Sequence, residues 1–397
     1  MKKVALFSGL LLAGLAGSQW VAGLEGPSAH ALQELLRVLT MLALGFIMIH
    51  VGYEFEIDRA RPKQYAVDYG IAATAAAFPW IFCALYFVFV LGERAQWGSF
   101  DTWKEALLTS RFAAPTSAGI LFSMLAAAGL SATWLFRKAR VLAIFDDLDT
   151  VLFMIPLKMM IVGLRWQLAF IVLAMVVMLW LAWRYLHALR WPVTWPWVLT
   201  YAALIVGVSE AIYKGSKLLD DTVPVHIEVL LPAFVLGCML ARPAGHDPHV
   251  DDAREGHQEG PPESGEQRVA TIVSAAFMVL VGLSMPKIEL GAGQSIATIT
   301  WHVAWITLLA NLGKMYPLFC YRGEASFRER LALCVGMWPR GEVGAGVLAV
   351  SLGYGIAGLS VTVAVLSLAL NLVLTGAFIV VVKRLLRAPA SPAGAST

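Results

Sequence analysis

Three carboxyl side chains lie inside an apolar segment of the chain that is long enough to cross a membrane. Residues 141–157 read Val-Leu-Ala-Ile-Phe-Asp-Asp-Leu-Asp-Thr-Val-Leu-Phe-Met-Ile-Pro-Leu. Placing one charged side chain at the centre of a membrane costs about 2.5–3.5 kcal/mol on insertion scales. Acidic side chains at that depth are typical of ion pathways and proton relays. The motif therefore indicates transport of a cation or of protons, with Asp146 and Asp147 as the groups that bind them.

The spacing of these acids predicts how a helix would present them. Asp147 follows Arg140, the last of a basic cluster, by seven residues, which places it about 10 Å deeper along a helix. That depth suits an acid reached from the cytoplasm. Asp146 and Asp147 are about 100° apart around the helix and face different neighbours. Asp149 is expected on another face, in a supporting role.

A buried pair of carboxylates needs a positive partner, and Lys314 is the best candidate. It lies in the apolar sequence Ala310-Asn311-Leu312-Gly313-Lys314-Met315-Tyr316-Pro317. We expect its ammonium group to balance one aspartate, Asp146. The alternative is that the long side chain extends to the membrane surface and leaves only its methylene groups in the apolar region.

The composition is that of a chain with many membrane-spanning helices. Of its 397 residues, 59% are hydrophobic and 14% are charged, whereas soluble domains contain about 25% charged residues. A net charge of +3 gives no indication of nucleic-acid binding. The four cysteines lie in apolar segments without paired spacing, and we read them as small buried residues. We expect no resident cofactor and no enzymatic activity.

Twelve apolar segments are each long enough, or nearly so, to cross a membrane. The first also resembles a secretory signal, but its apolar run continues to Leu24, and we expect it to be retained. The segments are 4–24, 31–53, 66–91, 104–130, 139–161, 165–187, 195–213, 223–241, 268–288, 295–320, 328–353 and 357–383.

Lysine and arginine residues gather in alternate connections, which predicts that both termini lie in the cytoplasm. The opposite connections contain fewer of them, with Lys214 and Lys217 as the main exception. A path of twelve spans places all of the following clusters on one side: Lys2–Lys3, Arg59–Lys63, Arg137–Arg140, Arg184–Arg190, Arg322–Arg330 and Lys383–Arg387.

One long polar stretch divides the chain into two membrane halves. Residues 242–267 are rich in Gly, Pro, Glu and Asp and have no apolar periodicity, which is typical of a solvated linker. The expected halves are therefore 1–241 and 268–397. The histidines of this linker also admit a role in sensing metal or pH.

Two of the apolar segments contain a proline near their middle, beside glycine and polar residues. The first reads Arg-Phe-Ala-Ala-Pro-Thr-Ser-Ala-Gly over residues 111–119, and the second reads Gly-Met-Trp-Pro-Arg-Gly-Glu-Val-Gly over 336–344. Proline removes a backbone donor and clashes with the preceding turn. Pro115 and Pro339 therefore predict interrupted helices rather than continuous ones, although a simple kink is the alternative for each.

These two segments are the fourth and the eleventh of the twelve. Because successive spans alternate in direction and seven is an odd number, helices that correspond across this offset run in opposite directions. This pattern is typical of inverted repeats whose ion site lies where the interrupted helices cross. The core helices would then be 66–161 and 295–383. Arg340 and Glu342 flank the second interruption. We expect them to neutralise each other or the helix ends, with direct ion binding as the alternative.

Taken together, these residues resemble the bacterial monovalent cation/proton antiporters, in the second branch, which includes sodium/proton exchangers and potassium-efflux proteins. The similarity runs over most of the chain, and Pro339–Glu342 is its most specific string. The other strings are Gly52–Asp58, Ala114–Ala118, Phe145–Asp147, Gly282–Pro286 and Gly313–Lys314.

The resemblance implies an NhaA-type fold in the bacterial inner membrane, usually as a homodimer, that exchanges Na⁺ or another monovalent cation for H⁺. By this resemblance Asp147 alternately binds the cation and the proton, Asp146 pairs with Lys314, and Thr116 and Ser117 offer oxygen ligands. The paired aspartates imply electrogenic exchange. Two features depart from the family pattern, namely Asp149 and Lys158 in the aspartate helix.

Three alternatives stay open from the sequence. Potassium/proton exchange within the same family is the nearest. A sodium-coupled symporter of organic solutes would use a related fold but would not need Lys314. An intramembrane aspartyl protease is disfavoured, because its two aspartates face each other from different helices, whereas Asp146 and Asp147 are adjacent.

Overall fold

The computed structural model describes residues 2–21, 27–53, 55, 62–162, 166–219, 229–241, 265–286, 295–353, 356 and 358–387. In this part of the chain the secondary structure is helical, and the only β-type pairing is an isolated bridge between Leu189 and Leu240. The helices are α1 (Lys2–Val21), α2 (Pro27–Tyr53), α3 (Pro62–Tyr86), η1 (Phe87–Leu91), η2 (Arg94–Gln96), α4 (Phe100–Ser110), η3 (Arg111–Ala113), α5 (Ala118–Ala127), α6 (Trp134–Val162), α7 (Trp166–Arg184), α8 (Trp195–Leu219), α9 (Leu230–Met239), α11 (Gly265–Leu283), α12 (Ile296–Gly313), α13 (Pro317–Cys320), α14 (Phe327–Gly336), α15 (Glu342–Gly353) and α16 (Leu359–Arg387).

Eight helical stretches in the described residues are long and apolar enough to cross a membrane. Each of the twelve apolar segments read from the sequence overlaps at least one helix of the described residues, and twelve membrane spans stay a prediction. Helix α6 contains too many charged residues to meet the same criterion, and α4, α5, α14 and α15 are too short. The chain therefore has the all-α architecture of a membrane protein, with its charged and interrupted helices at the positions that the sequence singled out.

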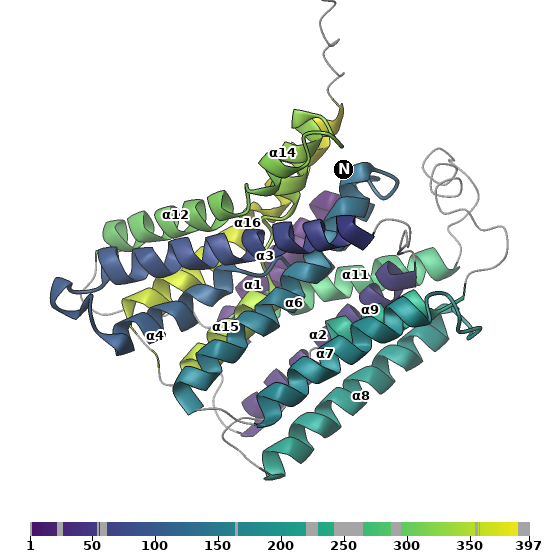
Figure 1. The fold of residues 1–397 in the computed structure, drawn as a ribbon, viewed down its shortest axis with the longest axis horizontal. Helices are drawn as coiled ribbons and strands as arrows, with labels where there is room; N and C mark the ends of the chain where they lie inside the picture. The colour runs from purple at the N-terminus through teal and green to yellow at the C-terminus, as the bar shows by residue number, and fades with distance from the viewer. Residues whose placement is uncertain are drawn as a thin grey trace, which may run out of the picture.

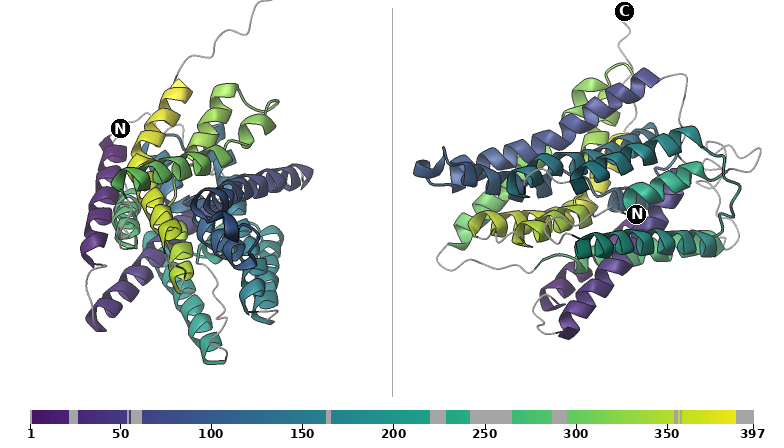
Figure 2. Two further views of the ribbon diagram at one scale, coloured as in Figure 1. Left: turned by 90° about the vertical axis from the view of Figure 1, so that its left-hand side faces the viewer. Right: turned by 60° about the horizontal axis from the view of Figure 1, so that its bottom comes forward.

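The helices form two groups that meet along α1 and α11 (Figure 1). One group consists of α2, α7, α8 and α9, which pack mainly on one another. The other consists of α3, α4, α6, α12, α14, α15 and α16. Figure 2 shows the purple α1 beside the green α11, and these two helices also contact α16 and α2 respectively. The aspartate helix α6 and the interrupted helices belong to the second group, except for α5, which contacts helices of both groups.

Close helix contacts depend on two pairs of glycines. A Cβ atom on Gly14 of α1 would collide with the Val279 carbonyl of α11, and one on Gly282 would collide with the Leu11 carbonyl. Gly52 of α2 and Gly237 of α9 face each other in the same way. Apolar burial does not drive helices together in lipid, so such close backbone approach supplies the packing energy instead.

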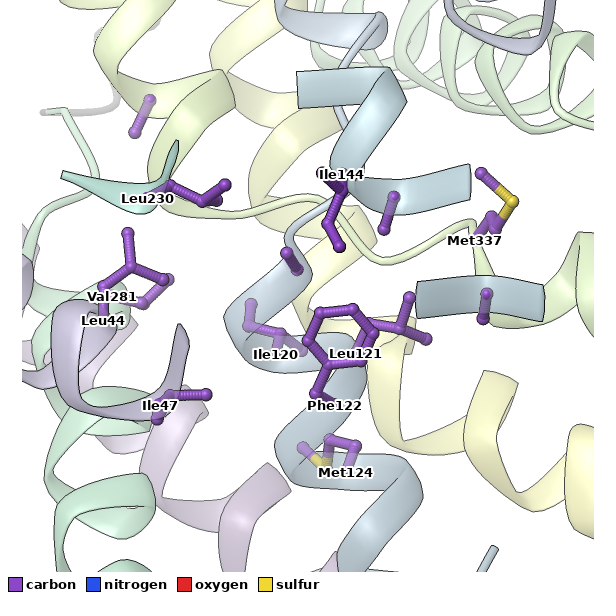
Figure 3. Packing of buried hydrophobic residues seen from close by; sticks show 14 of the residues in the cluster. Leu44, Ile47, Ile120, Leu121, Phe122, Met124, Ile144, Leu230, Val281 and Met337 are labelled. Atoms are coloured by element: carbon purple, nitrogen blue, oxygen red, sulfur yellow. The ribbon is translucent and has the colours of Figure 1, made fainter. Parts of the chain in front are cut away.

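Helix α5 lies at the centre of the molecule. Every residue from Ala118 to Leu125 is buried, and the helix contacts α1, α2, α6 and α11. Figure 3 shows Ile120, Leu121 and Phe122 of α5 among side chains from several other elements, including Ile144 of α6. Packing on all sides explains why a helix of only ten residues is held in a fixed position.

Two boundaries differ from the sequence-based expectation. Segment 295–320 is not one helix, because α12 ends at Gly313 and a turn separates it from α13. Pro317 begins α13, and proline has no N–H with which to continue the hydrogen-bond ladder of α12. In addition, α11 already begins at Gly265 and so includes the last three residues of the expected linker, with Glu266 in its first turn. Residues 242–264 lie outside the described part.

Candidate functional site

Both predicted helix interruptions are present. The first helix runs as α4 and η3 to Ala113 and resumes as α5 at Ala118. The second ends at Gly336 and resumes as α15 at Glu342. Restarting a helix leaves backbone N–H groups without a partner in the helix itself. The hydroxyl of Ser117 accepts one of them, from Ile120, at 3.3 Å.

The two interrupted segments bind each other directly. The backbone N–H of Ser117 donates to the Pro339 carbonyl at 2.9 Å. The hydroxyl of Thr116 donates to the Met337 carbonyl at 3.0 Å. These bonds satisfy carbonyl groups that a continuous helix would have used internally. Irregular backbone at this depth is tolerated only where protein surrounds it, and here Thr116, Ser117 and Pro339 are all buried.

Asp146 lies where the two interrupted segments meet, and its carboxylate is hydrogen-bonded to two other residues. Its carboxylate accepts the backbone N–H of Thr116 at 2.7 Å. Both of its oxygens accept from the Lys314 ammonium group, each at 2.7 Å. Asp146 and Lys314 are both 0% exposed. The ion pair expected between them is therefore present, and the alternative that Lys314 reaches the surface is wrong.

The position of Lys314 follows from the end of α12. Lys314 is the C-cap residue of this helix, where a positive charge is favoured by the partial negative charge of the helix end. Helix α12 can come close to α3 at this point because Gly313 packs on the backbone of Pro79, where a Cβ atom would collide. Local helix chemistry and close packing thus direct one ammonium group at Asp146.

Arg340 joins the second interruption to the ends of other helices. Its guanidinium group donates to the Ala113 carbonyl at 2.9 Å and to the Ala310 carbonyl at 2.7 Å. It also donates to the side-chain oxygen of Asn311 at 2.7 Å and to the Trp338 carbonyl at 3.0 Å. Arg340 therefore neutralises helix ends, as expected from the sequence. The side chain of Glu342, the other half of that expectation, lies outside the described residues.

The two halves of the chain use the same local construction. After Pro115, the N–H of Thr116 donates to Asp146 of α6. After Pro339, the N–H of Arg340 donates to the side-chain oxygen of Asn371 in α16 at 2.8 Å. Each interruption is thus held by a polar side chain from the following long helix. The acceptor is a charged aspartate in the first half and a neutral asparagine in the second, so only one of the two sites has an ionisable acceptor.

Of the remaining predicted residues, Asp147, Thr116 and Ser117 are buried, and their roles stay predictions. Asp147 is buried, and its charge acts on Lys314. Thr116 and Ser117 already use their side-chain oxygens, one as a donor to Met337 and one as a cap. The side chain of Lys158 lies outside the described part. No cluster of three or more His, Cys, Asp and Glu side chains suited to a resident metal occurs among the residues described.

Sequence reasoning missed two asparagines of the site. The side-chain oxygen of Asn311 accepts from Arg340 and, at 3.4 Å, from Asn371. Both are buried polar residues in apolar helices. That burial was the available signal, because an amide in a membrane-spanning helix needs a hydrogen-bond partner.

No protein-family model matches this chain, and no curated protein has significant sequence similarity to it.

Proposed function

We propose that this chain is a secondary transporter that exchanges Na⁺ or Li⁺ for protons across a bacterial inner membrane. The proposal combines the geometry of the site with the motif resemblance to monovalent cation/proton antiporters. In this proposal the chain adopts the NhaA-type fold, and it works as a homodimer by alternating access to one ion site.

One observation carries the proposal. A buried Asp–Lys pair lies where two interrupted helices bind each other through backbone carbonyl and N–H groups. Interrupted helices with this arrangement are the way transporters build ion sites inside a membrane. A purely structural ion pair would not need its aspartate bonded to the interruption itself, at the N–H of Thr116.

Two adjacent buried carboxylates give a proton and a cation a place to compete. Asp146 is bonded to Lys314, and Asp147 is the neighbouring buried acid. In this proposal Asp147 binds either a proton or a monovalent cation, and binding of one excludes the other. That competition is the physical basis of exchange.

The test is proton movement in vesicles that contain the purified protein. A preset pH gradient should collapse when Na⁺ or Li⁺ is added outside. The variant Asp147→Asn should abolish this response and still purify as a folded protein. The variant Asp101→Asn is the matched control, because it removes an acid that is 74% exposed and distant in sequence from the site.

The outcomes separate the candidates. A response to K⁺ alone would favour potassium/proton exchange at the same site. Near-normal sodium-dependent proton flux in Asp147→Asn would contradict the assignment of the ion site. The absence of a response to all three cations in the unmodified protein would contradict cation/proton exchange as the function.

A further inference from the structure

A second buried ion pair lies on α6, nearer to the start of the helix than Asp146. Lys138 is buried, and its ammonium group is 3.2 Å from a carboxylate oxygen of the buried Asp68 in α3. The same ammonium group lies 3.0 Å from a carboxylate oxygen of Glu324, which follows α13 in the chain. From the sequence Lys138 is only one member of a basic cytoplasmic cluster. In the structure it links three separate parts of the chain.

Tyr321 adds further contacts to this link. Its hydroxyl donates to the Asp68 carboxylate at 2.7 Å, and the Lys138 ammonium group lies 4.5 Å from the centre of its ring. The ring also packs edge-to-face on Trp134, the first residue of α6, with centroids 5.9 Å apart. Two carboxylates and the face of an aromatic ring thus surround one ammonium group. These contacts fix the start of α6 against the chain that follows α13.

The partners of Lys138 on that side belong to the stretch of chain that begins with Lys314. This connecting segment, residues 314–324, leads from the end of α12 through α13 towards α14. At its first residue the Lys314 ammonium group is 2.7 Å from Asp146, and at its last residue the Glu324 carboxylate is 3.0 Å from Lys138. The connecting segment and α6 therefore present opposite charges to each other at two points. In one pair the cation is on the segment, and in the other it is on α6.

The spacing of charges on α6 explains which aspartate Lys314 meets. Asp146 follows Lys138 by eight residues, which places it about 12 Å further along the helix and on the same stripe of its surface. Asp147 follows Lys138 by nine residues and so lies about 180° from it around the helix. A connecting segment that is bound to Lys138 is therefore aligned with Asp146, and Asp147 points to another side of the helix.

We propose that Lys138 is a positioning residue of the exchange reaction, which directs Lys314 to Asp146 and so keeps Asp147 open to the cation. This inference rests on the proposed function. Without the link at Lys138, a turn of α6 by one residue, about 100°, brings Asp147 to the ammonium group of Lys314 in place of Asp146. That ammonium group then competes with Na⁺ for the same carboxylate. Loss of the link therefore weakens cation binding, whereas loss of a merely structural link lowers the amount of active protein and leaves KM unchanged.

The experiment measures initial rates of proton movement against Na⁺ concentration in vesicles that contain the purified protein, which separates KM from kcat. The test variant combines Lys138→Met with Asp68→Asn, because replacing both members of a buried ion pair is often nearly neutral for stability. We expect its KM for Na⁺ to rise at least fivefold, with kcat lowered by less than twofold. Lys138→Arg keeps the charge and should give a KM within twofold of the unmodified protein. The control is Lys104→Met, which removes a partly exposed ion pair of α4 and should leave both constants unchanged.

A second variant keeps the test decisive if the first does not fold. Glu324→Gln with Tyr321→Phe removes the polar contacts of the connecting segment, one of them at a side chain that is 39% exposed, and keeps the buried Asp68–Lys138 pair. Its KM for Na⁺ should rise at least twofold. An unchanged KM in either folded variant, whether or not kcat falls, would overturn the positioning role and leave the exchange function intact. An unmodified protein without Na⁺-dependent proton movement would contradict the exchange function, and this proposal with it.

Discussion

Removal of one member of the Asp146–Lys314 pair should destabilise the protein strongly. The two N···O distances are 2.7 Å, and neither side chain is exposed. At an effective dielectric constant of about 20, charges at this distance attract by roughly 6 kcal/mol. Loss of water around both groups offsets part of this attraction. Breaking such a buried pair therefore costs about 3–5 kcal/mol, which we expect for Lys314→Met.

The two single variants should not be equivalent. Lys314→Met leaves two carboxylates, Asp146 and Asp147, without their shared cation. Asp146→Asn leaves Lys314 within the influence of the Asp147 charge, and its amide oxygen can still accept the Thr116 N–H. We therefore expect Asp146→Asn to be less destabilising than Lys314→Met. The double variant should recover part of the loss, because replacing a whole buried pair is often nearly neutral.

The assay is unfolding of the detergent-solubilised protein by sodium dodecyl sulfate, followed by tryptophan fluorescence. The control is Lys104→Met, which removes an exposed pair with Asp101 at 2.6 Å and should change the unfolding free energy by less than about 1 kcal/mol. Strictly additive losses for Asp146→Asn and Lys314→Met would refute the energetic coupling. A loss for Lys314→Met no larger than for Lys104→Met would refute the assigned magnitude.

Three further predictions address packing, the second interruption and charge movement. Gly52→Ala should lower the free energy of unfolding by about 1–3 kcal/mol through overpacking, because the added Cβ atom would collide with the Phe234 carbonyl. The control is Gly207→Ala, whose Cβ atom would point into open space; this change should be neutral in the same unfolding assay. Arg340→Lys should lower both stability and exchange, because one ammonium group cannot replace a planar donor that binds several carbonyls; wild-type exchange and stability would argue against this role. If exchange is electrogenic, an imposed membrane potential should drive sodium uptake even when the pH is equal on both sides, because moving one charge through 100 mV is worth about 2.3 kcal/mol. Sodium uptake that does not respond to a potential set with valinomycin would indicate one-for-one exchange.

Covalent sequence and local chemistry determine much of this protein. Long apolar runs must become helices in a membrane, because every backbone polar group needs a partner there. Proline removes a backbone donor and clashes with the preceding turn, and Pro115 and Pro339 stand beside glycine and polar residues, so both interruptions could be predicted. Proline alone is not sufficient, because Pro79 and Pro156 lie inside continuous helices. The extra cost of a buried charge likewise singles out Asp146 and Lys314 as partners without any coordinates.

Only the tertiary structure decided which groups the interruptions bind. Thr116 and Met337 are 221 residues apart, and no local pattern specifies that the Thr116 hydroxyl donates to the Met337 carbonyl. The carbonyls that Arg340 binds, and its link to Asn371 through the N–H, arise from the packing of helices far apart in the chain. Such contacts depend on the positions of whole helices relative to one another. The periodicity of the sequence carries no information about those positions.

The same limit applies to the end of α12. Segment 295–320 is apolar throughout, but the close approach of Gly313 to Pro79 accompanies the end of the helix there and the direction in which Lys314 points. The sequence thus determined which residues are too costly to bury without a partner, and the packing of helices distant in the chain determined which partner each one has.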